Sequence, residues 1–177
     1  MKQGRLAWTV IFSIISVALY SQEVFKPRPS PVGLATLRYK DAYVKVTYSQ
    51  PQKKGRKIFG GLVPYGEIWR TGANEATEIT LTRDMTIMDQ VVKAGTYSLF
   101  TIPGEDTWTI ILNTDLGLWG SYNYNPKLDL MRFAVPTTVN DVNFEAFTII
   151  FDQRNELADL LIMWDDVKLS LPLKFLN

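Results

Sequence analysis

The stretch VKLSLPLK, residues 167–174, decides the fold class, because apolar and polar side chains alternate along it. Residues two positions apart point to the same face of a β-strand. The alternation therefore predicts a strand with one face in a core and the other in solvent. The apolar face holds Val167, Leu169, Leu171 and Leu173, and the polar face holds Lys168, Ser170 and Lys174.

The same period of two recurs upstream and predicts four more half-buried strands. Two further runs are apolar on both faces and flank the turn formers Pro103 and Gly104, so they predict a central hairpin. Residues 158–164 are also apolar throughout, and we expect a strand there that ends in a turn at Asp165 and Asp166. The alternating segments are residues 43–48, 78–82, 131–135 and 147–151, and the hairpin strands are residues 96–102 and 108–112.

Helical periodicity is absent from every longer segment that follows the N-terminal region. Short strands separated by turn residues are typical of antiparallel sandwiches and barrels. We therefore expect an all-β fold, an antiparallel β-sandwich of about eight to ten strands that is jelly-roll-like or a related two-sheet fold. A chain of 177 residues is long enough for one substantial core but short for two, so residues 32–177 are expected to form a single domain.

The N-terminal region has the features of an export signal. Lys2 and Arg5 precede a mostly apolar run that is shorter than a spanning helix prefers, and the small residue Ser21 offers a cleavage point. Residues 1–21 are predicted to be a signal peptide, with a retained anchor as the alternative. Prolines favour an extended leader over residues 22–31. We expect an exported protein, periplasmic or associated with the outer membrane, with no transmembrane span after signal removal.

The composition argues against several classes of chemistry. The chain has no cysteine and no histidine, which rules out disulfides, cysteine nucleophiles and the usual zinc ligands. A formal net charge of +1 without a run of like charges indicates no nucleic-acid partner. Neither a clustered acidic loop nor a phosphate-cradling motif is present, so no metal and no cofactor are expected.

Two irregular segments are the candidate functional surfaces. The first is GRKIFGGLVPYGEIWRTGANEAT, residues 55–77, which we call the long motif, and the second is residues 117–124. Long irregular segments are often functional, and planar polar groups with aromatic rings suit a polar or sugar ligand. Trp108 and Trp164 lie in strand patterns and are assigned to the core. The candidate ligand-binding residues are Arg56, Tyr65, Trp69, Arg70, Asn74, Glu75, Trp119 and Tyr122.

Three interpretations of these residues are open. The first is a non-catalytic module that binds a polar or glycan ligand of the cell envelope. The second is a structural or protein-interaction module, in which Arg70 and Glu75 form an ion pair or bond to main chain and an envelope protein is the partner. The third is a carboxylate-dependent hydrolase, which the sequence favours least because no spacing identifies an acid pair and no catalytic residue is assigned. The acids available for such a pair are Glu67, Glu75, Asp115 and Asp129.

The chain also closely resembles the family of unknown function DUF2911. The resemblance is carried by GRKIFGGLVPYGEIWRTGANEATEI, KAGTYSLFTIPG, WTIILN, WGSYNY and VKLSLPLKF, and it extends from about Pro31 to Leu173. It implies an exported protein of an outer-membrane bacterium with one continuous domain, and it implies no activity, cofactor or substrate. The chain departs from the family at Gln50-Pro51, where Arg-Pro is typical.

Overall fold

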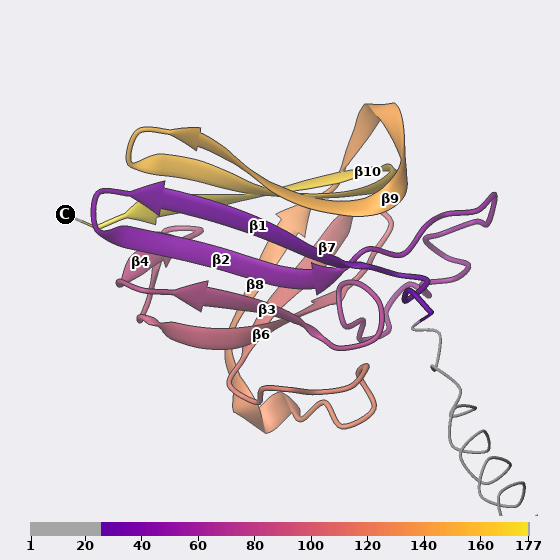
Figure 1. Cartoon of the computed structure of the whole chain (residues 1–177), viewed down its shortest axis with the longest axis horizontal. Coiled ribbons are helices and arrows are strands. Elements are labelled where there is room, and N and C mark those ends of the chain that lie inside the picture. Colours follow the sequence, from indigo (N-terminus) through magenta and orange to yellow (C-terminus); the bar gives the residue numbers. More distant parts are fainter. Residues whose placement is uncertain (1–25, 177) are drawn as a thin grey trace, which may run out of the picture.

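The computed structural model describes residues 26–176, and the signal peptide expected at residues 1–21 lies outside them. The described chain pairs ten strands into two antiparallel sheets, which confirms the all-β two-sheet fold (Figure 1). One turn of 3-10 helix, Pro126–Leu128, precedes the eighth strand. The strands are β1 (Val32–Tyr39), β2 (Ala42–Ser49), β3 (Thr77–Leu81), β4 (Met85–Ile87), β5 (Gln90–Val92), β6 (Gly95–Ile102), β7 (Thr107–Asn113), β8 (Asp129–Pro136), β9 (Thr138–Arg154) and β10 (Leu157–Phe175).

The six-stranded sheet is a meander that is interrupted once, by β4 and β5. In the six-stranded sheet the order is β1-β2-β3-β6-β7-β8, so sequence neighbours lie side by side except where β4 and β5 leave for the other sheet. The four-stranded sheet has the order β5-β4-β10-β9. A jelly roll is instead built from two Greek keys. Of the two arrangements we expected, the structure therefore has the related two-sheet fold.

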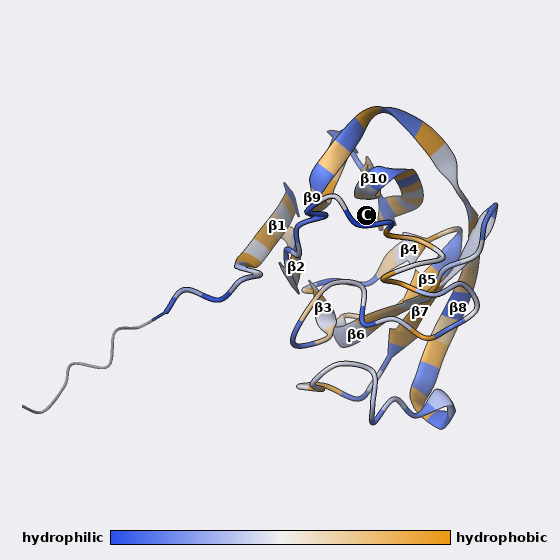
Figure 2. Cartoon of the chain, turned by 90° about the vertical axis from the view of Figure 1, so that its right-hand side faces the viewer, coloured by the Kyte–Doolittle hydropathy of each residue, from blue (hydrophilic) through white to orange (hydrophobic). Residues whose placement is uncertain are grey.

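Alternation along the strands places the core between the sheets. In β10, Leu169, Leu171 and Leu173 are buried, while Ser170 and Lys174 are exposed. Figure 2 shows the same alternation as orange and blue bands along β8 and β9. The facing sides of both sheets join in one large cluster of buried apolar residues. Period-two patterning is thus sufficient to set which face of each strand is inside.

The central hairpin is confirmed as β6 paired with β7. Its strands are apolar on both faces because a second, smaller core covers their outer face. Phe100 and Ile111 form this core with Ala76, and Leu118 and Tyr124 pack against it from the segment between β7 and β8. The segment that contains Trp119 is therefore held against the outer face of the sheet.

The turn predicted at Asp165 and Asp166 is wrong. The chain remains in β10 through both residues, and the pairing with β9 shifts register on either side of Asp165, whose φ is 56°. An irregularity of this kind bends and twists a long strand without ending it. This single strand of 19 residues pairs with β9 over residues 157–168 and with β4 over residues 173–175.

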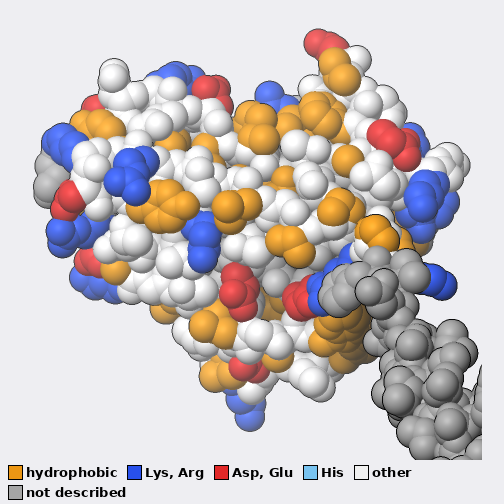
Figure 3. Space-filling model, in the orientation of Figure 1, with side chains coloured by type: hydrophobic (Ala, Val, Ile, Leu, Met, Phe, Trp, Pro, Cys, Tyr) orange, Lys and Arg blue, Asp and Glu red, His pale blue; other side chains and the backbone are white. Residues whose placement is uncertain are grey.

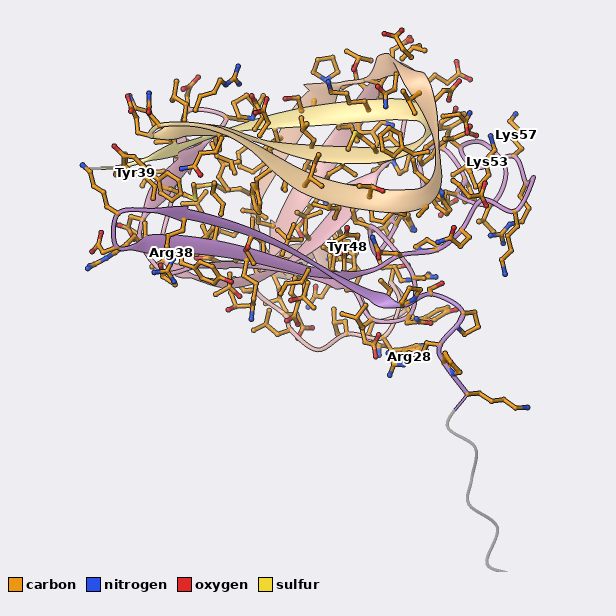
Figure 4. All side chains as sticks on the ribbon, turned by 45° about the horizontal axis from the view of Figure 1, so that its top comes forward. Arg28, Arg38, Tyr39, Tyr48, Lys53 and Lys57 are labelled. Carbon is orange, nitrogen blue, oxygen red and sulfur yellow. The ribbon has the colours of Figure 1, made fainter. Side chains whose placement is uncertain are left out.

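The two sheets are joined by hydrogen bonds between Tyr48 of β2 and Ile149 of β9. The Tyr48 hydroxyl donates to the carbonyl of Ile149 (3.2 Å) and accepts from its N–H (3.0 Å), and Tyr48 lies between the sheets in Figure 4. The chain that follows β2 continues this pairing, because the N–H of Phe147 donates to the carbonyl of Pro51. The start of the long connection between β2 and β3, which contains the long motif, is thereby fixed to β9.

The described surface carries mixed charge. On the face shown in Figure 3, basic and acidic side chains are interspersed and hydrophobic side chains are scattered among them. Across residues 26–176, no helix has the length and apolar character needed to cross a membrane.

Candidate functional site

The long motif forms an irregular excursion between β2 and β3. Gly60 has a φ of 68°, a conformation that glycine adopts readily, and a Cβ added there would lie 2.7 Å from the ring of Tyr65. Ile58, Phe59 and Val63 are buried in the main core and alternate with the exposed parts of the segment. The motif is therefore anchored by its own apolar side chains and displays the residues between them.

Trp69, which we predicted as a ring face for a ligand, belongs to the core. Trp69 is only 6% exposed. Its ring stacks on Trp164, with the ring centroids 6.0 Å apart, and packs edge-on to Phe147, with the centroids 5.2 Å apart. The indole N–H donates to the carbonyl of Gly72 (3.0 Å). An apolar ring with one satisfied donor is well suited to such a position. Trp69 thus ties the motif to the core rather than offering an open ring face.

Buried hydroxyls fix the backbone on either side of Arg70. The N–H and the carbonyl of Trp69 both pair with Thr101 of β6. The hydroxyl of Thr77 donates to the carbonyl of Thr71 (2.6 Å), and the hydroxyl of Thr71 lies 3.2 Å from that of Thr101. All three threonines are buried. These bonds set the position from which the Arg70 side chain extends.

A cleft of about 410 Å³ lies along the motif. Trp69 and Trp164 contribute to its floor, and residues of the leader and of the Trp119 segment contribute to its walls. The polar and charged residues on its lining are Ser30, Gln52, Lys54, Arg56, Glu67, Arg70 and Ser121, and the apolar ones include Pro29, Pro51, Leu62, Val63, Pro64 and Ile68.

Arg70 is the unusual group on this lining. Its Nε is buried and has no hydrogen-bond partner in the described chain. Removal from water lowers the pKa of the Arg70 guanidinium, and Tyr122 acts in the opposite direction. A guanidinium nevertheless stays charged at every ordinary pH. The cleft is therefore lined by a fixed positive charge, and the Nε beneath its surface is a donor without an acceptor.

Two other cations share the lining with Arg70. The Nε of Arg56 donates to the carbonyl of Lys53 (2.9 Å) and its Nη2 donates to that of Gln52, so this side chain is partly used in closing its own loop. Lys54 is exposed, and its main-chain N–H donates to the carboxylate of Glu145 (2.8 Å). The lining thus holds Lys54, Arg56 and Arg70 against a single acid, Glu67.

Glu75 and Asn74 do not lie on this cleft. Glu75 pairs with Arg28 of the leader (2.7 and 3.0 Å), which lowers the pKa of the Glu75 carboxyl. Asn74 has a φ of 59°, and its amide lies 3.4 Å from the carbonyl of Ser30. The ion pair between Arg70 and Glu75 that we considered is therefore wrong. Both residues fasten the leader, so that Pro29 and Ser30 form part of the cleft wall.

The segment that contains Trp119 lies directly beside the motif. Trp119 pairs with Glu75 in an isolated antiparallel bridge, and the N–H of Gly120 donates to the carbonyl of Asn74 (2.9 Å). Trp119 is 57% exposed and Tyr122 is 84% exposed, but neither ring is on the cleft lining. Of the predicted residues, the structure thus brings Arg56, Trp69 and Arg70 to the cleft and places Tyr65, Asn74, Glu75, Trp119 and Tyr122 around it.

The acids considered for hydrolysis are dispersed. Asp129 accepts from Tyr124 (2.7 Å) and from the Nε of Arg132 (2.8 Å), a network beside the 3-10 turn. Desolvation, followed by the bond to Asp129, raises the pKa of Tyr124 to about 12. Glu75 is held by Arg28, which leaves Glu67 as the one acid that the described chain contributes to the cleft. No group of three or more acids within residues 26–176 is placed to hold a metal ion.

The sequence did not point to the leader as part of the site. Pro29 and Ser30 carry no chemical signature, and their position depends on pairings with residues 44 to 47 positions away. Lys54 and Ser121 were also missed, because each is an ordinary polar residue whose role comes from the position of its loop.

Comparison with known proteins places the chain in one family. No curated protein and no solved structure matches this sequence. One family model matches residues 30–173, which include the long motif, the Trp119 segment and all but the end of β10. The chain therefore belongs to the family described as protein of unknown function (DUF2911).

Proposed function

We propose that this protein is an exported, non-catalytic binding module that takes a small polar ligand in the cleft of the long motif. A glycan fragment of the cell envelope is the ligand class that we favour. The observation that carries the proposal is Arg70, whose buried Nε lacks an acceptor on the wall of an open cleft. Buried donors are ordinarily satisfied, and exceptions often mark a functional position.

The cleft has the size and surface of a small-molecule site. Its volume of about 410 Å³ falls in the range usual for ligand pockets, which are apolar surfaces with a few placed polar groups. Leu62 and Ile68 supply apolar surface, and Gln52 and Ser121 supply groups that both donate and accept. This mixture suits a sugar ring, which has apolar faces and a polar rim.

Two features argue for binding without catalysis. Glycoside hydrolysis ordinarily needs two carboxyl groups about 5–9 Å apart, and Glu67 is the one acid among the described residues on the lining. In the described chain, no hydrogen bond joins the hydroxyl of Ser30 or Ser121 on the lining to a lysine or carboxylate that would activate it. The geometry thus favours a site that holds its ligand unchanged.

The test is a binding screen of envelope-derived sugars and glycans against three forms of the protein: wild type, Arg70→Ala and Arg38→Ala. Arg38 lies on β1, toward the end of the molecule opposite Lys53 and Lys57 (Figure 4), and so serves as the matched control. We expect Arg70→Ala to weaken binding about tenfold or more, because charge-assisted hydrogen bonds are lost, and Arg38→Ala to bind as wild type. A screen without a ligand, or equal binding by Arg70→Ala, would contradict the proposal.

Export is tested separately by mass spectrometry of protein recovered from the periplasm or outer membrane. We expect a chain that begins near Gln22, after removal of the signal peptide. Recovery of chains that retain Met1 in that fraction would instead support a membrane anchor.

A second function, binding of an envelope protein, is favoured by the exposed rings of the Trp119 segment. Trp119 and Tyr122 are both largely exposed and lie beside the motif, and exposed aromatic residues are common anchors of protein interfaces. Replacing both by alanine should abolish recovery of a cross-linked envelope partner and leave sugar binding in the cleft intact. Loss of sugar binding in that double variant would show that the rings belong to the cleft site.

A further inference from the structure

The charges around the cleft do not balance locally. Lys54, Arg56 and Arg70 are on the lining with Glu67 as their single acidic neighbour there. Within residues 26–176, no ion pair joins any of these three cations to a carboxylate. The lining therefore carries net positive charge, because its one acid does not balance three cations.

Two acids near the motif, Glu75 and Asp165, are already engaged by other cations. Glu75 pairs with Arg28 at 2.7 Å, and Asp165 pairs with Lys53 and accepts from the amide of Asn143 (2.6 Å). These pairs hold the leader and the start of the excursion, so they are not available to Arg70 without loosening either segment. Glu75 and Asp165 therefore do not neutralise the cations on the cleft lining.

Arg70 differs from the other arginines of this region in its lack of acceptors. Arg28 bonds a carboxylate and Arg56 bonds two main-chain carbonyls, whereas no acceptor in the described chain takes an N–H of Arg70. Its guanidinium is also partly withdrawn from water, which disfavours its charge in the free protein. An oxyanion would supply an acceptor and a counter-charge at the same time.

We propose that the ligand of the cleft carries a carboxylate or a phosphate, and that Arg70 binds this group. The inference rests on the proposed function and adds the chemical class of the ligand. The Nε is closed off from the cleft, so the anion meets the two Nη groups, which share one edge of the guanidinium and match two oxygens of either anion. Arg56 and Lys54 add positive charge nearby, which attracts the anion without requiring a second fork.

This arrangement also gives the site its specificity. A neutral sugar in the cleft would offer Arg70 hydroxyl oxygens as acceptors, but it would bring no negative charge to the guanidinium. Sites built around a buried polar group discriminate strongly against ligands that lack the matching group. An acidic sugar is therefore preferred over its neutral analogue, because only the acid supplies a counter-charge to Arg70.

The experiment compares three probes by titration calorimetry on the purified protein: glucose, glucuronate and glucose 1-phosphate. We expect at least one acidic probe to bind tenfold or more tightly than glucose, and the better of the two identifies the anion as carboxylate or phosphate. Arg70→Met should remove this preference, and Arg70→Lys should restore only part of it, because lysine retains the charge and lacks the fork. Arg83→Met is the control, since Arg83 pairs with Asp41 away from the cleft.

The outcomes separate the inference from the function on which it rests. If glucose binds as tightly as both acids, the inference of an oxyanion is overturned while the binding function stands. If none of the three probes binds and the glycan screen is also negative, both are overturned. If the acids bind tightly but Arg70→Met keeps the preference, Arg70 is not the anion-binding group and the inference is again overturned.

Discussion

Replacing Arg70 by methionine should make the free protein more stable. The side chain holds a buried Nε without an acceptor, and a buried donor left unsatisfied costs about 1–3 kcal/mol. Arg70 is only partly buried, so we take the lower end, about 1 kcal/mol. Methionine retains the length and the apolar stem and removes the charge. For a domain of this size, a gain of about 1 kcal/mol raises the melting temperature by about 2–4 °C.

The assay is thermal unfolding of wild type, Arg70→Met and Arg132→Met under identical conditions and without ligand. Arg132 is the matched control, because it donates to Asp129 (2.8 Å) and to the hydroxyl of Tyr124 (2.8 Å). Its replacement should lower the melting temperature, since two partners lose a bond. A fall in the melting temperature of Arg70→Met as large as that of Arg132→Met would refute the reasoning and make Arg70 a structural residue.

Three further predictions concern the frame of the site. Trp69→Ala should cost about 3–5 kcal/mol in chemical unfolding, whereas Trp119→Ala should change stability by less than about 0.5 kcal/mol; equal effects would contradict their assignment to core and surface. Tyr48→Phe should cost about 1–3 kcal/mol, because two main-chain groups of β9 lose their partner, and unchanged stability would argue against a stabilising link between the sheets at Tyr48. Arg28 lowers the pKa of the Glu75 carboxyl, so this pair stabilises the leader at pH values above the ordinary pKa of a carboxyl group. This contribution is lost as the pH falls below about 4. Faster proteolysis of the leader at that pH, and at neutral pH in Glu75→Gln, is the expected result; identical cleavage of wild type and Glu75→Gln at neutral pH would contradict it.

Apolar patterning predicted strands at β2, β3 and β6 to β10, but it identified neither β1, β4 and β5 nor the connections between strands. The faces of β10 and the burial of the central hairpin followed from which positions are apolar, since each strand must bury one side. The bend at Asp165 was read as a turn because an Asp pair looks the same in a turn and in a bulged strand. Pairing with β9 on both sides of Asp165 continues the strand through this position, and the sequence does not reveal that partner.

The candidate site was predicted only in part, because some of its contacts join residues that are far apart in sequence. The long motif and the Trp119 segment do lie side by side, and Arg70 is on an open cleft. The core packing of Trp69 was not predicted, because a tryptophan in an irregular segment can anchor the segment or face a ligand, and the sequence does not distinguish the two. The partners of Glu75 and Asn74 lie in the leader, far away in sequence, so no local pattern could have revealed them.

The most direct test of an oxyanion site at Arg70 is its own Nε–H resonance in a proton–nitrogen NMR spectrum, assigned by its absence from Arg70→Met. Titration with glucuronate and glucose 1-phosphate should move this resonance in a saturable way and leave that of Arg132 in place. If the Arg70 resonance stays fixed throughout both titrations, the proposed role of this side chain is wrong.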